Sequence, residues 1–123
     1  MTKERALAPG EEGIQRELSR GTMELAVLAL IDARKRYGYD LLTSLGSASD
    51  GSIAIKEGTL YPALHRMEDA GYITASWEAE GRAAPRKYYR ITKDGKARLE
   101  ALRTEWQRLA SGMERLLNGG AES

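Results

Sequence analysis

The chain has 123 residues, 41% of them hydrophobic, which is enough for the core of one domain with at most one appended helix. It has no cysteine and a single histidine, so disulfides, zinc sites built on His/Cys clusters and Cys-His catalysis are excluded. The net charge of +1 does not by itself suggest nucleic acid, and the longest apolar run, residues 25–31, is too short to cross a bilayer.

Two helices are predicted in the first half of the chain. Residues 23–33 are apolar on almost every side, which indicates a helix buried in a core or in a subunit interface. A short second helix is expected at residues 40–45. Residues 46–52 have the composition of a loop, and residues 53–55 are interpreted as one short strand.

A third helix is expected from residue 56 to residue 70. Leu60, Leu64 and Met67 share one face at helical spacing, so this face is predicted to be the inner one. Pro62 is expected in the first turn or so, where its missing N–H costs little.

The pattern then changes to that of a β-hairpin. Apolar and polar residues alternate over residues 73–80, which is typical of a half-buried strand. A turn at residues 81–85 separates it from a second strand at residues 86–92, which is rich in β-forming residues. The hairpin therefore has a basic tip.

A long helix is predicted from residue 93, with Thr92 as its N-cap. Its apolar residues alternate in steps of three and four, the spacing of a coiled-coil seam. These residues are Leu99, Leu102, Trp106, Leu109, Met113 and Leu116. Such a seam needs a partner helix, so we expect it to form the interface of a homodimer.

The predicted fold is mostly α with a small β-hairpin: a winged helix-turn-helix plus a long C-terminal dimerisation helix. We expect a mobile tail at residues 1–12, a DNA-binding domain at residues 13–92 and the dimerisation helix at residues 93–118. No phosphate-binding loop, dinucleotide fingerprint or nucleophile motif is present, so neither an enzyme nor a cofactor or metal is predicted. Residues 1–10 lack the apolar core of a signal peptide, so the expected location is the cytoplasm, with no membrane partner.

The outer face of the third helix is a candidate for contact with the major groove of double-stranded DNA. With the leucines inward, the outward set is Thr59, Tyr61, Pro62, His65 and Arg66. Hydroxyl, imidazole and guanidinium groups can bond to bases or phosphates, and a proline can touch a thymine methyl. The alternative is that Tyr61 belongs to the core and His65 is an ordinary surface residue.

Basic residues gather in the second half of the chain. Between residues 82 and 103 they far outnumber the acidic ones, which are Asp94 and Glu100. Arg82, Arg86 and Lys87 lie at the hairpin tip, where they suit phosphates or a minor groove and predict salt-dependent binding. The alternative is a hairpin that carries basic residues for solubility.

Four segments carry a family resemblance: residues 20–25 (RGTMEL), 37–39 (YGY), 57–68 (EGTLYPALHRME) and 86–92 (RKYYRIT). Taken in this order, they resemble the PadR family of bacterial transcriptional regulators over about residues 18–117. The resemblance implies a homodimer whose last helix packs on the partner, usually against its first helix. It also implies a near-palindromic operator, repression, and release by a small effector.

The residues assigned to DNA binding on these grounds are Tyr37, Lys56, Thr59, Tyr61, Pro62, His65, Arg66, Arg82, Arg86 and Lys87. The single C-terminal helix resembles the short subclass of the family, in which some members stack a flat aromatic ligand on tryptophans of this helix. Trp106 lies at the matching place, although its seam position is equally explained by packing in the dimer core. The predicted function is a repressor released by a small molecule; the alternative is a winged-helix adaptor that binds proteins without specific DNA binding.

Overall fold

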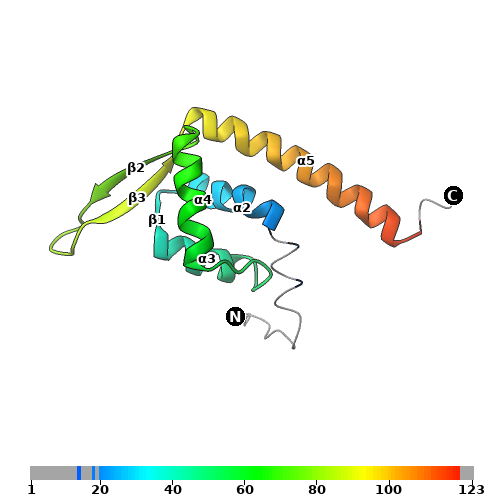
Figure 1. Ribbon diagram of the computed structural model, residues 1–123, viewed down its shortest axis with the longest axis horizontal. Coiled ribbons are helices and arrows are strands. Elements are labelled where there is room, and N and C mark those ends of the chain that lie inside the picture. Colours follow the sequence, from blue (N-terminus) through cyan, green and yellow to red (C-terminus); the bar gives the residue numbers. More distant parts are fainter. Residues whose placement is uncertain (1–13, 15–17, 19, 120–123) are drawn as a thin grey trace.

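The computed structural model describes residue 14, residue 18 and residues 20–119, so the expected tail at residues 1–12 lies outside the described residues. After a 3₁₀ turn at Arg20–Thr22, the elements are α2 (Met23–Ala33), β1 (Arg36–Tyr37), α3 (Gly38–Ala48), α4 (Glu57–Asp69), β2 (Ile73–Glu78), β3 (Arg86–Ile91) and α5 (Lys93–Leu117). The predicted order of three helices, a hairpin and a long helix is confirmed. In Figure 1 the hairpin and α5 extend from opposite sides of a body formed by α2, α3 and α4.

The sheet differs from the prediction because it has a third strand. β1 pairs antiparallel with β3, in the order β1-β3-β2, with Arg36 opposite Tyr89 and Tyr37 opposite Tyr88. The prediction of a strand at residues 53–55 is wrong. These residues form a loop, from which Ile53 and Ile55 pack against the core.

The second helix is also longer than its pattern suggested. It begins at Gly38 and continues to Ala48, three residues into the segment expected to be a loop. Gly46 is buried within α3, so close packing outweighs the low helix propensity of glycine at this point.

The core lies where the three helices of the body meet the base of the hairpin. It contains Val27, Leu28, Ile31, Leu41, Leu45, Leu60, Ala63, Leu64, Met67, Ile73, Tyr89 and Leu99. Full burial of each large aliphatic side chain contributes about 1.5–3 kcal/mol relative to exposure. The same core therefore fixes α4 and the hairpin relative to each other.

The exit of α5 from the sheet is fixed by its first turn. The Thr92 hydroxyl oxygen accepts a hydrogen bond from the Gly95 N–H at 2.9 Å, which confirms the predicted N-cap. A methyl group at Gly95 would collide with the Tyr72 carbonyl oxygen and lie 2.7 Å from Ile91 Cγ1, so only glycine allows this close approach. Ion pairs from α5 to α2 follow, with Arg98 Nε 2.8 Å from the Glu24 carboxylate.

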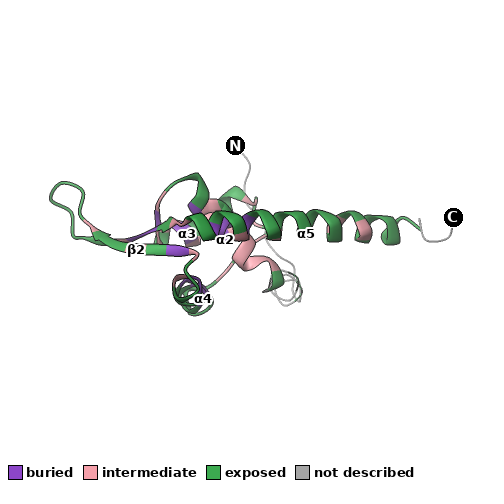
Figure 2. Cartoon of the chain, turned by 90° about the horizontal axis from the view of Figure 1, so that it is seen from above, coloured by how far each residue is buried: buried purple, intermediate pink, exposed green. Residues whose placement is uncertain are grey.

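The predicted seam divides into two parts. Leu99 is only 2% exposed and belongs to the core of its own chain, so the structure places it inside the body rather than on a free seam. Leu102 also packs against this core. From Trp106 onward α5 projects away from the body with its side chains mostly exposed, as Figure 2 shows.

Candidate nucleic-acid interface

The two faces of α4 are those that the sequence predicts. Leu60, Leu64 and Met67 are buried, together with Ala63. The exposed residues include Thr59, Tyr61, Pro62, His65 and Arg66. These five side chains are therefore available to a ligand on the outer side of the helix.

The position of Pro62 differs from the expected one. It is the sixth residue of α4 and so lies in the second turn, not at the start of the helix. Its missing N–H removes the hydrogen bond that would reach the Gly58 carbonyl four residues earlier. The fold tolerates this because Pro62 lies on the exposed side, where water reaches the backbone.

Tyr61 is half exposed, at 44%, and also packs within its own chain. A methyl group at Gly38 would lie 2.6 Å from Tyr61 Cζ and 2.7 Å from Cε1, and closer still to the hydroxyl oxygen. The phenol ring therefore lies directly over the first residue of α3. This contact joins the two helices of the helix-turn-helix, and it explains why glycine precedes Tyr39.

Basic side chains without an ion pair lie on both parts of the candidate interface, which are the outer face of α4 and the β2–β3 hairpin (the wing). Lys56 flanks the start of α4, Arg66 is on its outer face, Arg82 is in the hairpin loop and Arg86 begins β3. None of the four has an ion pair with any carboxylate in the described part of the chain. The Arg86 guanidinium instead lies 4.5 Å from the ring centre of Tyr37, so Tyr37 orients it by a cation–π contact.

Ion pairs engage basic residues elsewhere in the described chain, although Lys93 and Arg115 of α5 have none. The pairs include Arg34–Asp40, Lys35–Glu78, Arg36–Asp40, Arg90–Glu78, Lys96–Asp32 and Arg98–Glu24. Arg36 is buried and also donates to the Leu30 carbonyl at 2.9 Å and to the Ser44 hydroxyl at 3.1 Å. The basic run at residues 34–36 is thus engaged by carboxylates of its own chain, which its sequence did not reveal.

The acidic residues at the end of α4 are partnered as well. Lys87 Nζ, on the wing, lies 3.8 Å from the Glu68 carboxylate. His65 Nε2 lies 3.3 Å from Asp69 Oδ2, one turn later on the same helix. Lys87 and His65 therefore meet a carboxylate of their own chain before any ligand is bound.

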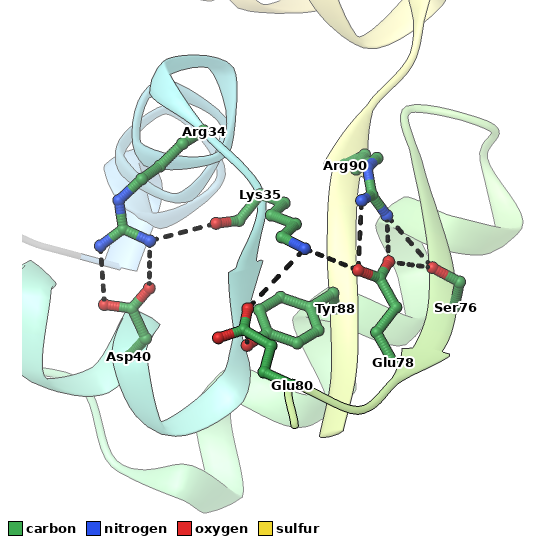
Figure 3. Close-up of polar contacts among 8 residues, drawn as sticks. All are labelled: Arg34, Lys35, Asp40, Ser76, Glu78, Glu80, Tyr88 and Arg90. Atoms are coloured by element: carbon green, nitrogen blue, oxygen red, sulfur yellow. Dashed lines mark hydrogen bonds and ion pairs between the residues drawn. The ribbon is translucent and has the colours of Figure 1, made fainter. Parts of the chain in front are cut away.

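The carboxylate of Glu78 joins the wing to the body (Figure 3). It accepts hydrogen bonds from Arg90, from the Lys35 ammonium at 2.7 Å and from the Ser76 hydroxyl at 2.7 Å. These donors, with Arg90 the strongest, hold the pKa of Glu78 far below its ordinary value. Lys35 also lies 4.5 Å from the ring centre of Tyr88, so both wing strands are tied to the segment between α2 and α3.

The projecting half of α5 presents an apolar face. Trp106, Leu109, Met113 and Leu116 are exposed at helical spacing. Two grooves run beside this face, and Thr22, Leu25 and Trp106 line both of them. From Trp106 onward, the seam predicted from the sequence is thus left uncovered by the described residues of this chain.

Within the described residues, no cluster of His, Cys, Asp and Glu side chains is arranged to hold a metal ion. No helix in that part of the chain is long and apolar enough to span a membrane.

Comparison with known proteins points to one family. A family model of the transcriptional regulator PadR-like family matches residues 27–101. The crystal structure of a PadR family transcriptional regulator from Eggerthella lenta is 36% identical, covers 87% of this chain and 91% of its own, and has a TM-score of 0.75. A PadR-like transcriptional regulator from Bacillus cereus is 32% identical, with coverage of 82% and 96% and a TM-score of 0.74. Uncharacterized protein X of Lysinibacillus sphaericus is 33% identical over 106 residues, which are 86% of this chain and 97% of that protein.

Proposed function

The chain belongs to the PadR-like family of transcriptional regulators, and from this premise we propose that it represses transcription as a homodimer bound to a near-palindromic operator. As a member of this family it is a regulator and not an enzyme. The observation that carries the proposal is the placement of four basic side chains that lack ion pairs within the described residues: Lys56 at the start of α4, Arg66 on its outer face, and Arg82 and Arg86 on the wing.

In this proposal α4 enters the major groove. Its 13 residues make a helix about 20 Å long, and its exposed Thr59, His65 and Arg66 supply hydroxyl, imidazole and guanidinium groups for base edges and phosphates. Tyr61 has a double role, because one part of its ring fixes α3 while the exposed part faces the ligand. Arg82 and Arg86 on the wing hold the flanking phosphates, and Lys87 exchanges Glu68 for a phosphate.

The dimer is proposed to form through the uncovered face of α5. Leu109, Met113 and Leu116 continue a seam that the chain itself leaves exposed, and burial against a partner removes this apolar area from water. In the proposed dimer a two-fold axis through this seam relates the two copies of α4, which we expect to lie on the same side. Half-sites one helical turn apart, about 34–36 Å, match such a pair of helices.

The effector is proposed to be a small, flat aromatic compound that stacks on Trp106. This side chain is 45% exposed and borders both grooves between α5 and α2. Stacking suits an indole that its own chain leaves partly uncovered. The other role of Trp106, packing within the dimer core, predicts no change in its environment when such compounds are added.

Selection from genomic DNA tests the proposed function. Fragmented DNA of the organism that encodes the chain is incubated with the protein, and the bound fragments are sequenced. Enrichment of one sequence with dyad symmetry is expected for a dimeric repressor. If no sequence is enriched, the chain is better explained as an adaptor that uses its winged helix to bind another protein.

A further inference from the structure

Trp77 breaks the burial pattern of its strand. On β2 the apolar residues Ile73, Ala75 and Trp77 share one face, and the alternation predicts that all three are covered. Ile73 is buried and Ala75 is half-buried, but Trp77 is 71% exposed. The strand runs beyond the body, so its last apolar residue has no covering element in the described part of the chain.

The exposed indole lies on the face of the wing against which α4 packs. Trp77 is directly opposite Lys87 in the β2–β3 register, so the two side chains leave the sheet on the same side. Lys87 reaches back to Glu68 of α4, at 3.8 Å, and its ammonium lies 5.7 Å from the ring centre of Tyr89. Trp77 therefore points to the side of the wing on which α4 lies.

The charges around Trp77 indicate what covers it. The acidic side chains at the end of β2, Glu78 and Glu80, interact with Lys35 on the opposite face of the wing. The face of Trp77 carries Lys87, which also reaches Glu68 of α4, and the hairpin loop after β2 carries Arg82. Arg86, opposite Glu78 in the register, belongs to the other face of the wing. An apolar surface bordered by positive charge matches a polyanion with apolar sugar and base surfaces between its phosphates.

We propose that Trp77 is a DNA-contact residue whose indole packs against deoxyribose and base edges in the minor groove beside the major groove occupied by α4. This inference rests on the proposed function. Apolar side chains that enter a minor groove contact features common to many sequences, so Trp77 adds affinity with little base selectivity. The contact carries no charge and releases no counterions, which separates its effect from that of a basic residue.

Binding titrations of Trp77→Ala and Trp77→Phe test this inference with two probes, the duplex selected from genomic DNA and a scrambled duplex of equal length. Trp77→Ala is expected to bind both duplexes about 5-fold to 150-fold more weakly, the range of 1–3 kcal/mol for a lost aromatic contact, with an unchanged salt slope. Trp77→Phe is expected to keep most of the affinity. Thr74→Ala, which alters an exposed residue on the other face of the same strand, is the matched control and is expected to bind like the wild type.

A spectroscopic measurement makes the test independent of folding effects. The chain has two tryptophans, so labelling with 5-fluorotryptophan gives two ¹⁹F resonances, and Trp77→Phe identifies the one that belongs to Trp77. Duplex DNA is expected to shift this resonance and reduce its exposure to solvent, as measured by the H₂O/D₂O difference.

The outcomes separate the inference from the proposed function. If the wild type binds DNA while the Trp77 resonance stays unchanged and Trp77→Ala binds as well as the wild type, the inference is wrong and the function stands. A Trp77 resonance that changes with protein concentration in the absence of DNA also overturns it, because a second copy then covers the indole. If the wild type binds neither duplex, the proposed function fails and the inference fails with it.

Discussion

Substitution of Gly38 by alanine is expected to destabilise the fold by forcing Tyr61 of α4 out of its place over α3. The new methyl carbon would lie 2.6 Å from Tyr61 Cζ and 2.7 Å from Cε1, whereas carbon atoms in contact are normally about 3.5–4.0 Å apart. The ring must therefore move by about 1 Å or more. Overpacking of this kind costs about 1–3 kcal/mol, and alanine in a helix returns about 0.5–1 kcal/mol relative to glycine. The expected net loss is the difference between these two ranges, at most about 2.5 kcal/mol and centred on about 1 kcal/mol.

A double-mutant cycle separates this clash from other effects of the substitution. In the Tyr61→Ala background the obstacle is absent, so Gly38→Ala is expected to be neutral or to stabilise the fold by up to about 1 kcal/mol. The free energy of unfolding is measured by urea titration of the four chains at one protein concentration, because dimerisation affects apparent stability.

Gly58→Ala is the matched control, since Gly58 is also helical but a methyl group there meets no atom within 4 Å. This control is expected to be neutral or stabilising. An equal loss from Gly38→Ala in both Tyr61 backgrounds would refute the reasoning, because the cost would then arise elsewhere than at the ring.

Three further substitutions test the wing, its attachment and the dimer. Lys87→Ala should weaken binding to operator and scrambled duplexes alike and lower the salt slope by about one; an unchanged slope would remove Lys87 from the interface. Because donors hold the pKa of Glu78 below its ordinary value of 4.5, its ion pairs stabilise the fold above that pH and are lost as the pH falls toward the lowered pKa. Glu78→Gln should therefore flatten the acid side of a plot of stability against pH, and an unaltered acid slope would contradict the network. Leu109→Asp should split the dimer in sedimentation and abolish operator binding, whereas Ser111→Asp, off the seam, should leave it intact; a dimeric Leu109→Asp chain would contradict the assigned seam.

Periodicity predicted the helices and the hairpin because each has its own amphipathic pattern. The sequence predicts the third helix at residues 56–70, and the structure has it at Glu57–Asp69. β1 was missed because its two residues are too few to show alternation, and they form a strand only where the edge of β3 offers hydrogen-bond partners. Ile53 and Ile55 resemble a strand in sequence, yet they serve as apolar anchors of a loop.

The sequence predicts which residues form the candidate site, but it predicts few of the contacts among them. The outward set on α4 and the basic wing follow from one face of a helix and one hairpin tip. The contact of Tyr61 with Gly38 and the bonds of Glu78 to Lys35 join segments distant in the sequence, so no local pattern encodes them. The heptad spacing that includes Leu99 marks an apolar stripe, but it does not tell which part of the stripe the chain buries itself.

The central claim is that this chain recognises a DNA sequence through α4 and the wing. The most direct measurement is a titration of the wild-type protein with the duplex selected from genomic DNA and with its scrambled counterpart, each at two salt concentrations. The account predicts that the selected duplex binds about 10³-fold or more tightly, and that binding to both weakens steeply as salt rises. Equal affinity for the two duplexes at both salt concentrations would contradict sequence recognition by this protein.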